Sequence, residues 1–160
     1  VDDTATHDQL MALGGRYVGL DEALAQADVV SLHCPLTPQT HHLIDAPRLA
    51  TCKPGLILVN TSRGALVDTD SVIEALKAEH LGGLAIDVYE QEADVFYRDW
   101  SSAIVADDTL ERLLSFHNVI VTGHQAFFTR EAMTTISRTT VASIGQFARG
   151  ERLTDELVAA

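Results

Sequence analysis

Short apolar segments alternate with longer amphipathic segments along this chain, which predicts strands joined by crossover helices. Four segments are apolar almost throughout and are bounded by polar residues or glycine. This pattern is typical of parallel strands that are buried on both faces of a sheet. The strand candidates are residues 28–33 (DVVSLH), 55–62 (GLILVNTS), 82–88 (GGLAIDV) and 118–122 (NVIVT). The pattern therefore predicts an α/β fold.

Amphipathic segments with the period of an α-helix lie beside these strands. One of them has two candidate N-cap residues, Asp68 and Asp70, and the sequence leaves both open. The last one ends at Gly150, a typical C-terminal stop. The segment 90–108 has the weakest pattern, and connections of that length in compact domains are usually functional. The helix candidates are 21–27, 68–79, 107–116 and 129–149.

Composition and charge narrow the class of protein. The chain has 160 residues, 46% hydrophobic and 21% charged, which suits one globular domain or part of one. A net charge of −12 would repel phosphate backbones, so we expect no binding to nucleic acid. We expect no membrane association, because no segment resembles a membrane span. Two cysteines, Cys34 and Cys52, are too few for a disulfide scaffold and predict a cytoplasmic protein.

Ionisable residues follow three of the candidate strands, where ligands bind in open parallel sheets. Arg63 could hold a carboxylate through two parallel hydrogen bonds, and His124 could transfer a proton near neutral pH. Glu92 beside His124 would orient the imidazole ring and favour its charged form. With a dinucleotide on the same edge, this set predicts proton and hydride transfer to a small acid.

Four segments together resemble a known enzyme family: SLHCPLTPQTHHLI, LVNTSRGALVD, LAIDVYEQE and VTGHQAF. In this order they resemble the D-isomer-specific 2-hydroxyacid dehydrogenases, and most closely the bacterial fermentative D-lactate dehydrogenases that use NAD. The resemblance covers essentially the whole chain. It implies that Arg63 binds the substrate, that His124 is the acid/base and that Glu92 orients His124. The implied reaction interconverts pyruvate and D-lactate with NAD, while a bulkier 2-keto acid remains an alternative substrate.

The resemblance also implies contacts with NAD. Asp87 would hold the nicotinamide amide, Cys34 and Pro35 would line the adenosine side, and Thr61 and Ser62 would border the nicotinamide. These residues all lie at or just after the ends of candidate strands, where the cofactor would extend along the sheet edge.

Two further positions leave alternatives open. The segment VDD at the start resembles the acidic end of a strand that binds the adenine ribose, with Asp3 as the ligand or Asp2 as the alternative. Phe127 either lines the substrate pocket or fills the core.

The chain departs from the family pattern in one respect, because it contains no G-x-G-x-x-G sequence. We interpret it as a C-terminal fragment with a partial Rossmann-type, doubly wound parallel sheet that lacks the first strand and the glycine-rich turn. Residues 1–128 would be the remaining dinucleotide-binding domain, and residues 129–160 a C-terminal helix and tail that return to the substrate domain. A non-catalytic remnant is the alternative. We expect the parent protein to form homo-oligomers and the fragment alone to be marginally stable.

Several ionisable residues have simpler interpretations. We expect Glu90 and Asp94 to belong to a solvated acidic loop. His33, Cys34, His41 and His42 suggest zinc, but they lack a second paired set of ligands, so we predict no metal site. We expect the adjacent His41 and His42 to lie on opposite sides of an extended loop.

Overall fold

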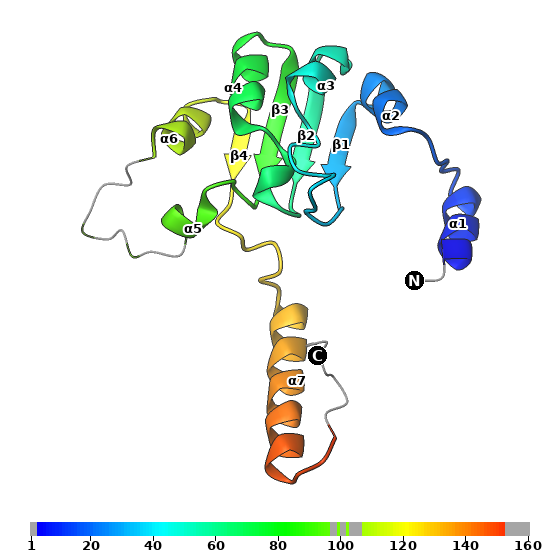
Figure 1. Ribbon diagram of the computed structural model, residues 1–160, viewed down its shortest axis with the longest axis vertical. Helices are drawn as coiled ribbons and strands as arrows, with labels where there is room; N and C mark the ends of the chain where they lie inside the picture. Colours follow the sequence, from blue (N-terminus) through cyan, green and yellow to red (C-terminus); the bar gives the residue numbers. More distant parts are fainter. Residues whose placement is uncertain (1–2, 97–98, 100–101, 103–106, 153–160) are drawn as a thin grey trace.

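The computed structural model describes residues 3–96, 99, 102 and 107–152, apart from the side chains of residues 3–7 and 94. Its centre is a four-stranded, all-parallel sheet in the order β1-β2-β3-β4 (Figure 1). The strands are β1 (Val29–Leu32), β2 (Leu56–Asn60), β3 (Leu81–Ile86) and β4 (Val119–Val121), which confirms the four strand predictions. Since all strands run the same way, their carboxyl ends lie at one edge of the sheet. We call this the carboxyl edge and define it as residues 33–35, 61–63, 87–92 and 122–128.

The four predicted helices are confirmed as α2 (Leu20–Gln26), α4 (Thr69–Lys77), α6 (Asp108–Leu114) and α7 (Arg130–Ala148). Side-chain caps explain where two of them begin. The carboxylate of Asp68 accepts a bond from the Ser71 amide at the start of α4, so Asp68 rather than Asp70 is the cap. The Thr129 hydroxyl caps α7 in the same way, and Gly150 follows it in the left-handed region at φ 68°.

Four short elements were not predicted: α1 (Asp3–Ala12), α3 (Ala46–Thr51), α5 (Glu92–Val95) and the 3-10 turn η1 (Gly64–Leu66). The helix α3 has clear start signals. Asp45 accepts a hydrogen bond from the Arg48 amide at 3.0 Å, and Pro47 occupies the first turn, where the missing amide proton costs nothing. This helix spans only six residues, too few for an apolar period to stand out.

The predicted strand end at residues 1–3 is wrong for Asp3, which is the first residue of α1. The described residues contain no strand before β1, so nothing there pairs with Asp3 as a strand would. A carboxylate at a helix N-terminus is favoured by the helix dipole. The alternative, Asp2, lies outside the described residues, and contact of either residue with a ribose remains a prediction.

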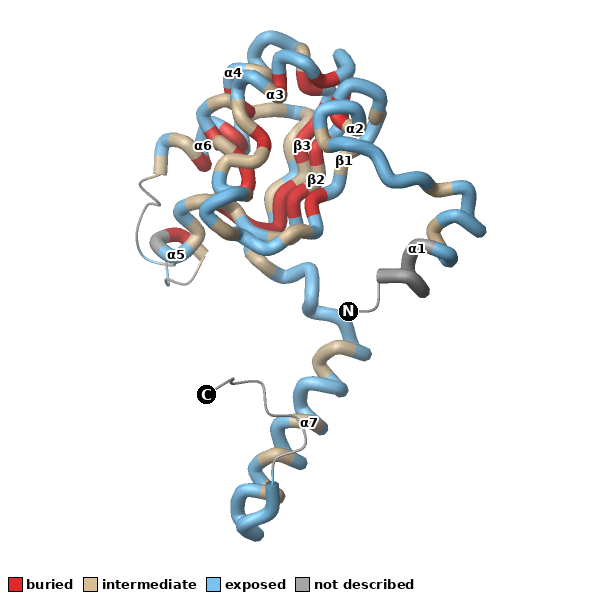
Figure 2. The backbone as a smooth tube through the Cα atoms, turned by 45° about the vertical axis from the view of Figure 1, so that its right-hand side comes forward, coloured by how far each residue is buried: buried red, intermediate tan, exposed pale blue. Residues whose placement is uncertain are grey.

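The expectation that the sheet is buried on both faces is also wrong. Helices α2, α3, α4 and α6 form one layer, and their apolar side chains share a core with alternate strand residues such as Leu58 and Leu84. Strand residues on the opposite face are open, with Val29, Ile57 and Ile120 exposed by 56%, 43% and 65%. The strand register places these open positions on one face. Buried positions accordingly concentrate between the sheet and its helices (Figure 2).

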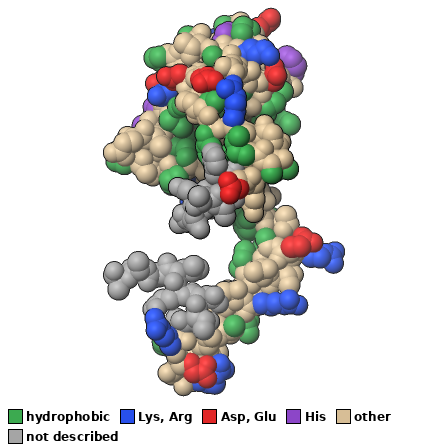
Figure 3. Space-filling view, turned by 90° about the vertical axis from the view of Figure 1, so that its right-hand side faces the viewer, with side chains coloured by type: hydrophobic (Ala, Val, Ile, Leu, Met, Phe, Trp, Pro, Cys, Tyr) green, Lys and Arg blue, Asp and Glu red, His purple; other side chains and the backbone are tan. Residues whose placement is uncertain are grey.

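The long helix α7 extends away from the sheet, and α1 also lies apart from it (Figure 1). None of the residues of α7 is buried, and apolar side chains such as Val141, Ile144 and Phe147 are exposed on it. Apolar side chains therefore reach the surface on both the sheet domain and α7 (Figure 3). Among the described helices, none combines the length and the apolar character needed to cross a membrane. The assignment of 129–160 to a substrate domain remains a prediction.

Candidate active site

His124 and Glu92 form a direct pair at the carboxyl edge. The Nδ1 atom of His124 lies 3.1 Å from Oε1 of Glu92, and both side chains are largely shielded from water. Glu92 begins α5 after β3, while His124 follows β4, so two neighbouring strands deliver the pair. A carboxylate on Nδ1 fixes the ring orientation, so Nε2 is the nitrogen suited to proton transfer.

Asp87 fixes the loop that carries His124. Its buried carboxylate accepts hydrogen bonds from the Thr122 hydroxyl and from the amides of Gln125 and Ala126, both at 2.8 Å. The carbonyl of Asp87 also accepts a bond from the His124 amide at 2.7 Å. His124 itself has φ 54°, a left-handed conformation that is uncommon for residues other than glycine. These contacts therefore hold a strained turn in the shape that directs the imidazole toward Glu92.

The ionisation of Asp87 agrees with this role. Burial raises its pKa, but hydrogen bonds from Thr122, Ala126 and Gln125 and the charge of His124 outweigh burial and leave the pKa below its usual value. Asp87 is thus a charged anchor for the loop. Contact of Asp87 with the nicotinamide amide remains a prediction. The structure shows a further role for Asp87, which is to anchor the loop that carries His124.

Tyr89 supports Glu92 and is itself held by Asp107. The Tyr89 amide donates to Oε2 of Glu92 at 3.2 Å, which leaves Oε1 for His124. The Tyr89 hydroxyl donates to Asp107 at 3.0 Å, and the same carboxylate oxygen caps α6 by accepting from the Leu110 amide. Burial and the Asp107 carboxylate raise the pKa of Tyr89 far above its usual range, so the hydroxyl remains a donor.

Arg63 lies on a turn that the buried Asn60 organises. The Asn60 amide group donates to the Arg63 carbonyl at 2.8 Å, and its side-chain oxygen accepts from the Ser62 amide at 3.1 Å. The Arg63 side chain is exposed, and its Nη1 donates to the Ser62 carbonyl at 2.6 Å. Most of the guanidinium fork is therefore available to solvent or to a carboxylate ligand.

The turn that carries Arg63 packs against the segment that carries Glu92. A side-chain carbon added to Gly64 would lie 2.2 Å from the Tyr89 carbonyl carbon and 2.5 Å from the Glu90 nitrogen. Only glycine allows this approach between the two backbones. His124 and Glu92 are thus in direct contact, while Arg63 shares their edge through the backbone of its turn.

Apart from Asp3 in α1, the residues predicted to contact NAD lie on the carboxyl edge. The Ser62 hydroxyl donates to the Cys34 carbonyl at 2.7 Å, which ties the loop after β2 to the loop after β1. Pro35 and Thr61 are exposed beside this bond. The two loops therefore form one surface, and their contacts with NAD remain predictions.

Phe127 does not fill the core, because 51% of its surface is exposed. It packs edge-on against Phe128, with 6.1 Å between ring centroids. Both rings, together with His124 and Gln125, line an open cavity of about 380 Å³. The core-filling interpretation is therefore wrong, and the lining of a substrate pocket by Phe127 remains a prediction.

The sequence did not single out the supporting residues Asn60, Thr122 and Tyr89, although all three lie within the motifs that carried the resemblance. Asn60 at the end of an apolar strand was the available signal, since a buried amide needs specific partners.

The interpretation of Glu90 as a solvated acidic residue is wrong. Its side chain is only 20% exposed and contacts His42 and Thr69. The side chain of Asp94 lies outside the described residues.

Residues 1–126 match the family model described as "D-isomer specific 2-hydroxyacid dehydrogenase, NAD binding domain". A 2-hydroxyacid dehydrogenase homolog of Zymomonas mobilis is 50% identical over 91% of this chain and 44% of its own length. The D-lactate dehydrogenase of Escherichia coli is 47% identical over 92% of this chain and 45% of its own length.

Solved structures agree with these relatives. A D-lactate dehydrogenase from Aquifex aeolicus, complexed with NAD and lactic acid, superposes with a TM-score of 0.80 at 35% identity. The superposition covers 90% of this chain and 44% of that structure. The chain therefore spans less than half the length of these relatives. With most of its residues matched, it belongs to the D-isomer-specific 2-hydroxyacid dehydrogenase family, within the NAD-binding domain.

Proposed function

We propose that this chain supplies the NAD-binding and acid–base half of a D-lactate dehydrogenase, which converts pyruvate, NADH and a proton to D-lactate and NAD. The observation that carries this proposal is the His124–Glu92 pair on a loop that Asp87 anchors. In the proposed reaction His124 donates its Nε2 proton to the substrate oxygen as the carbonyl is reduced. Glu92 stabilises the imidazolium before transfer and keeps the ring aligned.

Arg63 would bind the substrate carboxylate. Its exposed guanidinium can form two parallel hydrogen bonds with a carboxylate, which would also orient the keto group toward His124. The Phe127–Phe128 cavity would accept the methyl group of pyruvate or a larger side chain. A bulkier 2-keto acid is therefore the second substrate that we would assay.

We propose that residues at the carboxyl edge bind the two ends of an NAD molecule. The joined loops at Cys34 and Ser62 provide one continuous surface along the strand ends, where dinucleotides bind in such sheets. Bound NADH would supply the hydride. The 160 residues contain no glycine-rich turn to hold the pyrophosphate. We therefore propose that NAD binds to this chain together with another segment, which provides a glycine-rich turn for the pyrophosphate.

Partners and location follow from the same proposal. The substrate would be a small 2-keto or 2-hydroxy acid. The open sheet face and the uncovered helix α7 favour a homo-oligomeric enzyme in which other segments cover these apolar surfaces. A reducing cytoplasm suits the two cysteines, which are both free in the structure.

The proposal is tested by NADH oxidation with pyruvate and with phenylpyruvate in the full-length gene product that carries these residues. We expect D-lactate as the product and a rate advantage for pyruvate. Faster turnover of phenylpyruvate would assign the bulkier substrate. Turnover of neither acid, together with no change in NADH fluorescence on titration, would favour the non-catalytic remnant.

A further inference from the structure

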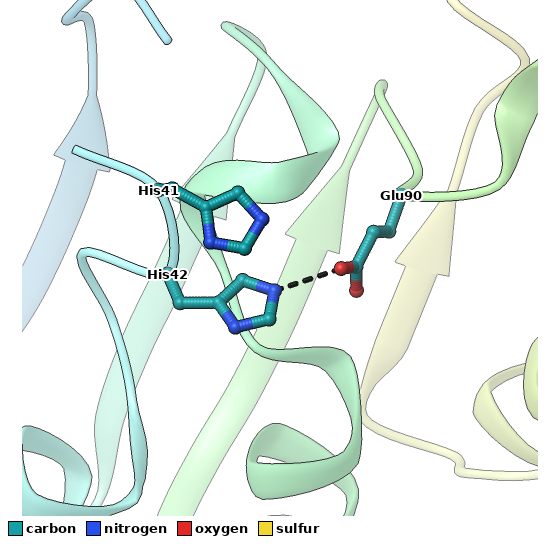
Figure 4. Close-up of side chains that lie close together, drawn as sticks. All are labelled: His41, His42 and Glu90. Atoms are coloured by element: carbon teal, nitrogen blue, oxygen red, sulfur yellow. Dashed lines mark hydrogen bonds and ion pairs between the residues drawn. The ribbon is translucent and has the colours of Figure 1, made fainter. Parts of the chain in front are cut away.

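His41, His42 and Glu90 form a cluster that lies apart from the His124–Glu92 contact. The side chains of the three residues turn toward one another (Figure 4). One potential ligand atom from each residue lies within 4.8 Å of the other two. The prediction that the two histidines lie on opposite sides of an extended loop is therefore wrong. Their rings stack with 4.0 Å between centroids and an interplanar angle of 28°.

The backbone explains why two adjacent histidines face the same way. His42 has φ 49°, a left-handed conformation that reverses the side-chain alternation of an extended chain. Its amide donates to the Ala65 carbonyl at 2.8 Å, which fixes this turn against η1. A strained conformation that neighbouring contacts maintain is a feature often found at ligand sites.

The carboxylate of Glu90 completes the cluster. Its Oε1 atom lies 2.7 Å from Nε2 of His42, and its Oε2 atom accepts from the Thr69 hydroxyl at 3.0 Å. A hydroxyl partner of this kind orients a metal-binding carboxylate from the outer shell. The hydrogen-bond network accounts for His42 and Glu90, but it does not involve the ring of His41.

The charges around the cluster favour a bound cation. Two neutral imidazole rings and a carboxylate can share one cation. The carboxylate of Asp68 also lies close enough to His42 to interact with it. The formal net charge of −12 adds to the attraction for cations.

We propose that His41, His42 and Glu90 bind one borderline divalent transition metal ion, with Zn²⁺ as the representative ion. Two imidazoles and a carboxylate are a typical ligand set for Zn²⁺, and water would complete the coordination. Ligand atoms about 2.1 Å from a tetrahedral ion are about 3.4 Å apart, so the His42–Glu90 contact would widen slightly. The ion would take the place of the hydrogen bond between these two residues.

The metal would link two segments, the loop after β1 and the segment after β3, and the first of these is already held to η1. His42 contacts Ala65 through its backbone, and Glu90 lies two residues before Glu92. Binding should therefore stabilise the folded chain by mass action. This proposal does not depend on the proposed dehydrogenase activity.

The test titrates the purified 160-residue chain with Zn²⁺ by calorimetry and with Co²⁺ by visible absorption. We expect one ion per chain and at least about tenfold weaker binding in His41→Ala and in Glu90→Gln. His41→Ala is the decisive variant, because it leaves the His42–Glu90 hydrogen bond in place. Mg²⁺ should not compete, since it prefers oxygen ligands.

Two control variants separate this site from other histidines. His117→Ala removes an exposed histidine before β4, and His124→Ala removes the imidazole of the candidate active site. Both should bind Zn²⁺ as the unmodified chain does. Equal affinity in His41→Ala and the unmodified chain would overturn the proposal. A loss of affinity in His124→Ala that His41→Ala does not share would assign the ion to the active site instead.

Discussion

At the scale of single residues, the candidate site depends on buried polar groups that hold exposed ones in position. Asn60 and Asp87 are almost inaccessible to water, yet each supports a turn that carries a reactive side chain. Strand and loop patterns predicted the positions of Arg63, Glu92 and His124. They could not predict the left-handed conformations of His42 and His124, because few residues other than glycine adopt them and long-range hydrogen bonds maintain them.

Replacing Asp87 with asparagine should destabilise the chain by about 2 to 3 kcal/mol at neutral pH, since it removes a charged acceptor of three hydrogen bonds. The pKa of Asp87 is lowered in the folded state. Its stabilising contribution is therefore present above the unfolded pKa of about 3.9 and is lost as the pH falls through the folded pKa.

Urea unfolding at a series of pH values checks this prediction. The unmodified chain should lose stability below about pH 4. Asp87→Asn should lose less over the same range, because the titrating group is gone. The exposed Asp8 serves as the control, and Asp8→Asn should leave the profile unchanged. An identical acid profile for Asp87→Asn and the unmodified chain would contradict the anchoring role.

At the scale of elements, strand and helix positions followed from the sequence, while their environment did not. The apolar strands suggested burial on both faces, but the described residues cover only the face under α2, α3, α4 and α6. A periodic pattern reports which residues prefer an apolar environment and does not say which segment provides it. The helix α3 was missed because its six residues show no period, although Asp45 and Pro47 mark its start.

The close approach of η1 to the segment after β3 makes Gly64 sensitive to substitution. In Gly64→Ala the new methyl group would meet the Tyr89 carbonyl carbon at 2.2 Å. Because this neighbour is backbone, we expect a loss of about 1 to 3 kcal/mol in the free energy of unfolding. In the full-length enzyme we also expect a higher KM for pyruvate, since Arg63 precedes Gly64.

Gly19→Ala is the matched control for this substitution. Gly19 has φ −65°, and a side-chain carbon there would have no neighbour within 4 Å. Thermal unfolding of both variants measures the difference. Equal melting temperatures for Gly64→Ala and Gly19→Ala would mean that the two backbones are not held in contact.

At the scale of the whole molecule, the open sheet face should control self-association. Val29, Ile57 and Ile120 expose large apolar surfaces on one face, and such patches promote association. Replacing Ile120 with lysine should therefore reduce association of the purified chain without loss of the fold. Light scattering over a range of concentrations, with circular dichroism as the check on folding, measures this.

Leu58 provides the contrast, because it lies on the covered face and is fully buried. Leu58→Lys should unfold the chain, since it would place a charge in the core. A monodisperse unmodified chain, with no effect of Ile120→Lys, would show that the open face does not drive association.

The central claim is that His124 is the proton donor of a 2-hydroxyacid dehydrogenase and that Glu92 orients it. The most direct test is the kcat for pyruvate reduction by NADH in the full-length gene product with His124→Ala. The matched control is His117→Ala, which removes an exposed histidine near the opposite end of β4. This role of His124 predicts a loss of about 10² to 10⁴-fold in His124→Ala and no change in His117→Ala. Equal kcat values in both variants would contradict it.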